Sequence, residues 1–245
     1  MALTLKASGV ATACVQVIAV DGSTIKEFVS GATIGSGLTQ TGTLATGSRT
    51  WNGHASTAYL QTNGTDNSLE ITSPPTNSNP TTVMFVFAET GAISGTSFLS
   101  GDGAGVTVFG HSSGVFILGD PSNATAIQGT VVSTTSAYSL SLSAKATNAF
   151  SYFALEGNTA VAVDRLDASP SGALSSDVGL KNIGTFAGGG RMALKLIVSL
   201  VMNRDITLAE FNAIHGDPIG TLFDGGGAPP ELHVPVKGTV KRFRQ

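Results

Sequence analysis

The acidic residues of the chain stand singly, and this bears on whether the chain could hydrolyse a glycosidic bond. That reaction needs two carboxyl groups on either side of one bond, one as the acid and the other as nucleophile or base. Glu70, Glu89 and Glu156 are solitary, and residues 164–167 are typical of a solvated turn with a local ion pair. The sequence therefore does not favour a glycosidase.

The histidines and the single cysteine lack the spacing that metal binding or nucleophilic catalysis requires. His54, His111, His215 and His233 are far apart in the sequence, so they form no metal-ligand motif. Cys14 falls within a predicted strand, where a catalytic nucleophile is not expected. A triad whose members meet only in the fold remains an alternative. We expect no metal, no cofactor and no enzyme activity.

Three aspartates lie in loops rich in glycine or serine, where they could contribute to a calcium site. They are Asp102, Asp120 and Asp177. Calcium needs several oxygen ligands that converge from loops, and no dense cluster of Asp and Asn surrounds these residues. The sequence favours turn residues that hydrogen-bond to their own backbone.

Aromatic residues could provide a surface for a sugar, because an exposed ring offers an apolar face to its C–H groups. The candidates for glycan contact are Trp51, Tyr59 and Tyr152. Aromatic residues make up only 7% of the chain, and most of the twelve phenylalanines fall in strand-like segments. For Trp51 the pattern favours a core position over a binding platform.

The C-terminal segment differs from the rest of the chain in composition. Residues 225–245 contain four of the thirteen Lys and Arg residues but a single acidic residue, behind a spacer rich in Gly and Pro. Such an extended basic arm, residues 224–245, suits docking on an acidic neighbouring subunit as an added strand. The predicted assembly residues are Lys237, Lys241, Arg242, Phe243 and Arg244.

The overall composition indicates a β-rich protein with few charges. Charged residues make up 12% of the chain, about half the usual share, and Gly, Ser and Thr are abundant, which suits short strands joined by tight turns. The formal net charge of −3 disfavours nucleic acid or an anionic membrane as the partner. So few charges are tolerable if much of the surface packs in an assembly.

Apolar runs at roughly ten-residue spacing predict a sandwich or barrel. Residues 82–88 are apolar on both faces and predict a central strand, and residues 138–144 alternate cleanly. Residues 192–202 fit a strand or a helix, and we favour a strand. Residues 58–71 predict a hairpin around Asn63 and Gly64. We expect an N-terminal β attachment element at 1–31, a linker at 32–50 and the main domain at 51–223.

One short helix is predicted near the C-terminal side. Thr207 is the expected N-cap, and Glu210 completes a capping box three residues later. Ile206 can pack against Phe211, and Gly216 begins the stretch that ends the helix.

Residues 203–215 resemble the closing signature of laminin-G-like, concanavalin A-like domains, in which a final strand runs into N-R-x-L-[ST]-x-x-E-[IF]-x-x-[IL]. The resemblance covers about residues 51–223 and implies an all-β, concanavalin A-like jelly-roll sandwich with one short C-terminal-side helix. Residues 217–223 are similar to modules common in bacteriophage virion proteins. Hydrolytic members of the family carry a Glu-x-Asp-x-x-Glu cluster, and this chain has none.

Together these patterns favour a virion structural or accessory protein, such as a capsid-decoration protein or a head or tail fibre subunit. It would be a homo-oligomer held to other virion subunits, capsid or tail proteins, through residues 1–31 and 228–245. The alternative is a carbohydrate-binding adhesin that recognises host surface glycans. A low share of charges suits the first, and loop aromatics suit the second.

Overall fold

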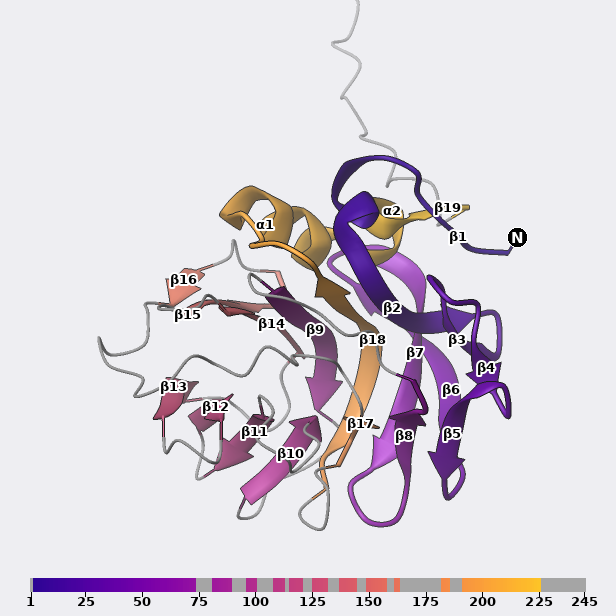
Figure 1. Ribbon diagram of the computed structural model, residues 1–245, viewed down its shortest axis with the longest axis horizontal. Coiled ribbons are helices and arrows are strands. Elements are labelled where there is room, and N and C mark those ends of the chain that lie inside the picture. Colours follow the sequence, from indigo (N-terminus) through magenta and orange to yellow (C-terminus); the bar gives the residue numbers. More distant parts are fainter. Residues whose placement is uncertain are drawn as a thin grey trace, which may run out of the picture.

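The computed structural model describes residues 2–73, 81–89, 96–100, 108–112, 115–120, 125–131, 137–144, 149–157, 161–163, 182–185 and 191–225. Within these ranges the molecule is built mainly from β-strands, with a few short helices near one side (Figure 1). No helix in this part of the chain is long and apolar enough to cross a membrane.

The elements follow one another in a simple order. The described strands are β1 (Thr4–Leu5), β2 (Cys14–Asp21), β3 (Thr24–Glu27), β4 (Thr33–Ile34), β5 (Gly37–Thr41), β6 (Ala45–Trp51), β7 (His54–Asn63), β8 (Ser68–Ile71), β9 (Thr81–Glu89), β10 (Thr96–Ser100), β11 (Val108–Ser112), β12 (Val115–Asp120), β13 (Thr125–Val131), β14 (Ala137–Ala144), β15 (Ala149–Leu155), β16 (Val161–Val163), β17 (Asn182–Ile183), β18 (Ala193–Met202) and β19 (Phe223–Asp224). The helices are the 3-10 turn η1 (Gly9–Ala13), α1 (Leu208–Gly216) and α2 (Pro218–Leu222).

A large sheet runs through the molecule with the strand order β16-β15-β14-β9-β18-β2-β3-β4-β5-β8-β17. Strands β10 to β13 form a separate four-stranded sheet, which lies away from the helices in Figure 1. The short strands β1 and β19 pair with each other, so segments near the two ends of the described chain lie side by side. The all-β sandwich expected from the sequence is confirmed.

Strand β18 organises the large sheet because it has two partners on one edge. Its first half pairs with β7, where Leu196 lies opposite Leu60, and its second half pairs with β2, where Leu200 lies opposite Val17. Strand β9 pairs along its other edge. The ambiguous segment at 192–202 is therefore a strand, as favoured.

The centre of the sheet is buried on both faces. In β9, Val83, Phe85 and Phe87 belong to one apolar core, and the alternate residues Met84 and Val86 belong to a second. Successive strand residues point to opposite faces, so a strand between two cores must be apolar throughout. The prediction of a central strand at 82–88 is confirmed.

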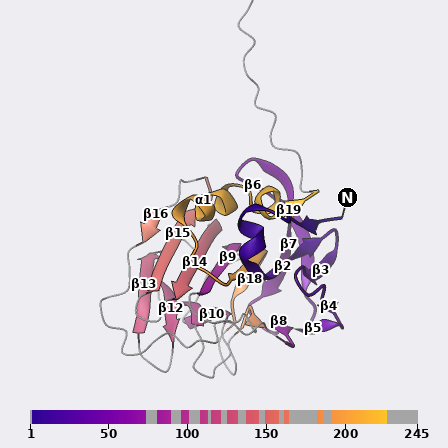
Figure 2. The same cartoon turned by 45° about the horizontal axis from the view of Figure 1, so that its top comes forward.

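The second core lies between the sheet and the helices, which gather on one side of it (Figure 2). Phe211 and Ile214 of α1 are fully buried there with Leu222 of α2. Ile206, just before the helix, is buried in the same core, so the predicted packing of Ile206 near Phe211 is present. Replacing a buried Phe by Ala costs about 3–5 kcal/mol, so this layer holds the helices firmly.

The predicted N-terminal boundaries differ from the structure. Residues 1–31 were expected to form an attachment element, yet β2 lies inside the large sheet between β18 and β3. Residues 32–50 were expected to be a linker, yet they form β4, β5 and most of β6. Alternation in a strand shows that it has an apolar face but does not identify its neighbour.

The predicted hairpin at residues 58–71 is wrong. Strand β7 pairs with β6 and β18, whereas β8 pairs with β5 and β17. The Asn63 side chain accepts hydrogen bonds from the backbone N–H groups of Thr65 and Asp66, and Asn67 donates to the Thr43 carbonyl. The loop therefore turns β8 toward β5 instead of folding it back on β7.

Candidate ligand-binding cleft

A cleft of about 700 Å³ lies where three segments meet: the β2–β3 turn, the β6–β7 hairpin and the start of α2. Its apolar lining includes Leu3, Val20, Ala58 and Ile219. Its polar lining includes the side chains of Asp21, Ser48, His54, Ser56, Thr57 and Asp217. A cleft of this volume, with an apolar lining and a few convergent polar groups, is typical of a small-molecule site.

A tight turn forms one wall of the cleft. Trp51 pairs with His54 across the two-residue turn of Asn52 and Gly53. The φ angles of Asn52 and Gly53 are 45° and 87°, and a turn that joins twisted strands needs positive φ at both central positions. Asn and Gly adopt this conformation most readily, so the dipeptide places His54 at the first position of β7.

Ser56, three residues into β7, has a φ of 59°. Outside glycine a positive φ is uncommon, and it disrupts the regular alternation of a strand. The residue is exposed and lines the cleft. This unfavourable backbone conformation thus lies at the surface where a ligand would be held, as strained residues often do.

His54 and Asp217 meet across the cleft from different elements. The Nδ1 atom of His54 lies 3.6 Å from Oδ2 of Asp217, and both side chains are mostly buried. The other carboxylate oxygen of Asp217 accepts a 2.8 Å hydrogen bond from the N–H of Gly220, which caps α2. Thr57 Oγ1 donates to the carbonyl of His54 at 3.1 Å. The imidazole and the carboxylate therefore hold a fixed place in the cleft.

Asp21 lines the same cleft from the end of β2. Its Oδ1 atom accepts a 3.1 Å hydrogen bond from the N–H of Leu3, which ties the N-terminal segment to the end of β2. Asp21 is partly buried and is followed by Gly22, whose φ of 65° forms the β2–β3 turn. The cleft thus holds two carboxylates, each with one hydrogen bond to the backbone.

Trp51, a sequence candidate for glycan contact, is a core residue. Its side chain is fully buried in the second core, and its Nε1 donates a 2.6 Å hydrogen bond to the carbonyl of His215. The Arg49 guanidinium lies 5.6 Å from the ring. No face of this indole is available to a ligand, as the position of Trp51 between the sheet and α1 dictates.

Of the other two aromatic candidates, Tyr59 is not among the residues that line the cleft. Tyr59 is half-buried against the second core, and the Lys195 ammonium lies 5.2 Å from its ring. Tyr152 lies on β15, opposite Ser141 of β14, and its side chain is outside the described residues.

The predicted assembly arm falls outside the described residues, which end at Gly225. This applies to Lys237, Lys241, Arg242, Phe243 and Arg244. The prediction that these residues mediate assembly therefore stays a prediction.

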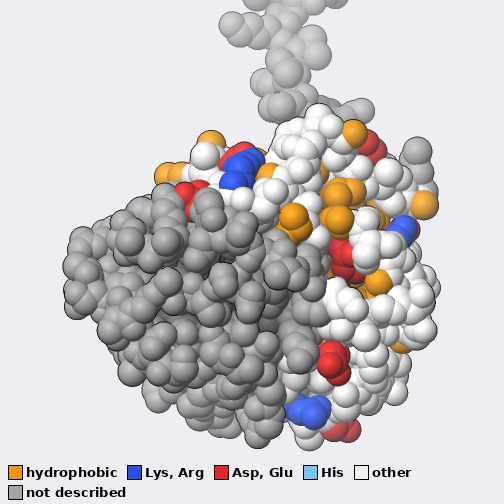
Figure 3. Space-filling model, viewed as in Figure 1, with side chains coloured by type: hydrophobic (Ala, Val, Ile, Leu, Met, Phe, Trp, Pro, Cys, Tyr) orange, Lys and Arg blue, Asp and Glu red, His pale blue; other side chains and the backbone are white. Residues whose placement is uncertain are grey.

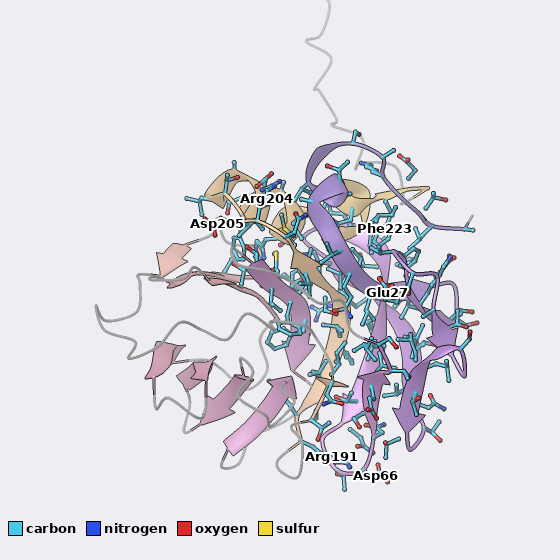
Figure 4. The ribbon with its side chains drawn as sticks, in the orientation of Figure 1. Glu27, Asp66, Arg191, Arg204, Asp205 and Phe223 are labelled. Atoms are coloured by element: carbon cyan, nitrogen blue, oxygen red, sulfur yellow. The ribbon has the colours of Figure 1, made fainter. Side chains whose placement is uncertain are left out.

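The predicted helix cap is present. Thr207 Oγ1 accepts from the N–H of Glu210, and Oε2 of Glu210 accepts from the N–H of Thr207. Arg204 adds two hydrogen bonds to the Glu210 carboxylate, at 2.6 and 2.9 Å. These bonds lower the pKa of Glu210 from 4.5 to about 2. Figure 4 labels Arg204 beside α1.

A second hollow, of about 370 Å³, lies beside β3. The buried carboxylate of Glu27 lines it (Figure 4) and accepts hydrogen bonds from the backbone N–H groups of Val17, Val29 and Ser30. These three bonds fix the chain after β3, so Glu27 serves the fold. The larger cleft is the better candidate for a ligand.

Sequence reasoning did not bring His54, Asp21 and Asp217 together. His54 was noted only as an isolated histidine, and its partner lies more than 160 residues away. The local signals were the turn dipeptides at Asn52 and Asp21, both followed by glycine. In the part of the chain that the structure describes, no group of three or more His, Cys, Asp or Glu residues could hold a metal ion.

No family model and no curated protein matches this chain. Among solved structures, the fold is similar to one of botulinum neurotoxin type C, whose cell entry is described as dependent on two ganglioside molecules, with a TM-score of 0.55 and 8% identity. It is also similar to Trypanosoma rangeli sialidase in complex with 2,3-difluorosialic acid, with a TM-score of 0.55 and 12% identity.

The similarity extends over most of this chain but over only a third to a half of the neurotoxin and sialidase chains. It covers 84% of this chain and 51% of the neurotoxin chain, and 83% of this chain and 33% of the sialidase chain. The chain thus spans about half and about a third of these proteins. At such identity the likeness establishes the class of the fold, a β-sandwich shared by proteins with different activities.

Proposed function

We propose that the chain is a carbohydrate-binding module that holds a glycan in the cleft between the β2–β3 turn, the β6–β7 hairpin and α2. The observation that carries the proposal is the composition of this cleft. Two carboxylates, an imidazole and several hydroxyls converge over an apolar lining. Sugars present the complementary surface, with hydroxyl groups around an apolar set of C–H bonds.

The chemistry of the polar groups fits sugar hydroxyls. An ionised carboxylate has about four acceptor sites. Asp21 uses one oxygen for the N–H of Leu3, so its second oxygen can accept from a sugar hydroxyl. In Asp217 one oxygen accepts from Gly220 and the other faces His54, but lone pairs remain on the carboxylate for a sugar hydroxyl. Ser48 and Ser56 add hydroxyls that donate or accept. Leu3, in the same lining, can pack against the sugar ring.

The solved neighbours support this proposal. The neurotoxin is described by its interaction with gangliosides, and the sialidase is described with a sialic acid derivative bound. Both descriptions concern sugar ligands on proteins of the same fold class. Because this chain matches only part of each, we propose binding alone and not the activity of either whole protein.

Binding without hydrolysis agrees with the state of the two carboxylates. Asp217 already caps α2 and lies against His54, and Asp21 holds the N-terminal segment. Hydrolysis would require one carboxyl group to donate a proton and the other to attack or activate water. Groups bound to the backbone are suited to hold a ligand in place.

The test is binding of the full chain to an array of glycans, followed by titration of each hit. We expect His54→Ala to weaken binding at least tenfold, and Asp21→Asn to weaken it as well, because the variant keeps an oxygen for the Leu3 N–H but loses the charge. Thr39→Ala, on an exposed position of β5 outside the cleft, is the matched control and should bind normally. Unchanged affinity in both cleft variants, at unchanged thermal stability, would show that the cleft is not the site.

A location in a virion remains our second proposal, favoured by one observation. Charged residues make up only 12% of the chain, and few charged side chains mark the described part of the face in Figure 3. Such a surface suits contact with other subunits, including further copies of this chain. Sedimentation of the full chain tests this: a single monomeric species at micromolar concentration would count against a homo-oligomeric subunit.

A further inference from the structure

We infer that the cleft selects neutral glycans and discriminates against acidic ones such as sialylated sugars. The inference rests on the proposed function and specifies its ligand. It follows from the charges that line the cleft. Among the described residues of the lining, Asp21 and Asp217 carry negative charge, and neither Lys nor Arg is present.

The one basic side chain of this lining is His54, and it already faces a carboxylate. Its Nδ1 atom lies 3.6 Å from Asp217, so a protonated imidazole would be balanced by that partner. An anionic ligand would gain no net positive charge from this pair. It would also meet the carboxylate of Asp21, which lines the same cleft.

Cations on the adjacent elements are engaged elsewhere. Arg49 follows the cleft residue Ser48 on β6, and its guanidinium pairs with the carboxylate of Glu156 at 2.5 Å. Lys6 donates to the carbonyl of Gly220. Lys26 lies 4.9 Å from the ring of Phe28. These three side chains are not among the residues that line the cleft.

The N–H of Gly220 at the start of α2 is not available to an anion either. The N–H of Gly220, which points toward the start of the helix, is bound to the carboxylate of Asp217. A ligand carboxylate would have to displace Asp217, and it would then leave that charge without its partners. A hydroxyl of a neutral sugar can instead donate to the same carboxylate, with no repulsion between like charges.

Sialic acid carries a carboxylate, and proteins hold such groups best with a bidentate Arg or free N–H donors. The described part of this cleft offers carboxylates in their place. A terminal neutral hexose is the ligand class that these residues fit.

The experiment compares matched glycans on the full chain: one neutral oligosaccharide, and the same oligosaccharide with a terminal sialic acid. We expect the neutral form to bind at least tenfold more tightly, which corresponds to about 1.4 kcal/mol. The difference should shrink as salt rises from low to physiological concentration, because the repulsion is screened.

Charge variants identify the cause of the preference. Ser48→Arg places a cation on an exposed strand position within the cleft, and it should bring the sialylated form to within about threefold of the neutral one or above it. If Ser48→Arg does not fold, Thr46→Arg places a cation in the cleft from another exposed position of the same strand. Thr39→Arg adds an equal charge outside the cleft and should leave the preference unchanged.

The outcomes separate the two proposals. Equal or tighter binding of the sialylated glycan by the unaltered chain, lost in His54→Ala, would overturn the charge preference and leave glycan binding in the cleft intact. A preference for the neutral glycan that Ser48→Arg and Thr46→Arg do not change would also overturn it. Absence of binding to both glycans and to the wider array would overturn the proposed function itself.

Discussion

The indole N–H of Trp51 donates to the carbonyl of His215 across 164 positions of sequence, at 2.6 Å. The side-chain amide of Asn52 donates to the same carbonyl at 2.9 Å. His54 follows Trp51 by three residues, and Asp217 follows His215 by two. The shared carbonyl therefore holds the β6–β7 turn against the end of α1 and sets the two walls of the cleft relative to each other.

Replacing Trp51 by Phe tests this relationship. The variant removes the N–H donor and part of a fully buried ring, so we expect the free energy of unfolding to fall by about 2–3 kcal/mol. Affinity for the glycan should fall as well, because His54 and Asp217 lose a common anchor. Urea unfolding measures the first effect and titration calorimetry the second. Full affinity in a destabilised variant would show that the hydrogen bond serves the fold alone.

The Arg204–Glu210 pair predicts a dependence of stability on pH. Hydrogen bonds from Arg204 lower the pKa of Glu210 from 4.5 to about 2 in the folded protein. The ionised carboxylate therefore stabilises the fold above about pH 4.5, and this contribution is lost as the pH falls toward 2. Glu210→Gln should lower the free energy of unfolding by about 1–2 kcal/mol at pH 7, a discounted figure because the Arg204 side chain is 39% exposed.

A comparison at low pH isolates that contribution. The difference between Glu210→Gln and the unaltered chain should be mostly lost near pH 2, where about half of the Glu210 carboxylates are protonated. Glu70→Gln, at the exposed position of β8, removes an equal charge and should change stability little at any pH. A deficit for Glu210→Gln that persists in full at pH 2 would assign the effect to packing of the helix start.

The single cysteine should be unreactive while the protein is folded. Cys14 is buried beneath η1, and burial raises the pKa of its thiol to about 12. At pH 8 a pKa near 12 leaves on the order of 10⁻⁴ of the thiol as the reactive thiolate. We expect no labelling by iodoacetamide in the folded protein and complete labelling in 6 M guanidinium, followed by mass spectrometry. Rapid labelling without denaturant would mean that η1 opens readily.

Gly184 should tolerate no side chain. A Cβ there would lie 2.6 Å from Cγ2 of Thr62, and its φ is 81°. Thr62 is fully buried and joins β7 to β18 by donating to the Met192 carbonyl, so it has little room to move. We expect Gly184→Ala to lower the free energy of unfolding by about 2–4 kcal/mol.

Gly35 provides the matched control for that substitution. Its φ of 82° is nearly the same, but a Cβ would meet nothing within 4 Å. Gly35→Ala should therefore cost only about 1 kcal/mol, the cost of the backbone conformation. Thermal unfolding of the two variants separates steric clash from backbone strain, and equal losses would contradict the role given to Thr62.

Features set by neighbouring residues could be predicted from the sequence. The α1 cap depends on Thr207 and Glu210, which are three positions apart, and the predicted capping box formed. The burial of β9 on both faces depends on the unbroken apolar run of that strand, so it could also be predicted from the sequence. At residues 192–202 the periodicity alone did not decide between strand and helix, and the scarcity of helix signals elsewhere favoured the strand that the structure shows.

Features set by distant residues could not be predicted. The alternation of β2 gave it an apolar face, but nothing in residues 14–21 specifies β18 as its partner. The Asn63 loop has hairpin chemistry, yet the β7 edge that a hairpin would use is taken by β18. The cleft is formed by three segments that approach one another only in the folded protein. Its residues are therefore far apart in the sequence and form no common sequence motif.

The pairing of β2 with β18 also determines when the large sheet can form during translation, because the two strands are synthesised far apart in time. Strand β2 leaves the ribosome about 180 residues ahead of β18, with Val17 and Ile18 still lacking the strand that buries them. Pairings between such distant segments form slowly, and exposed apolar strands invite aggregation meanwhile. The apolar residues of β2 that face β18 therefore stay unpaired until the last long strand emerges.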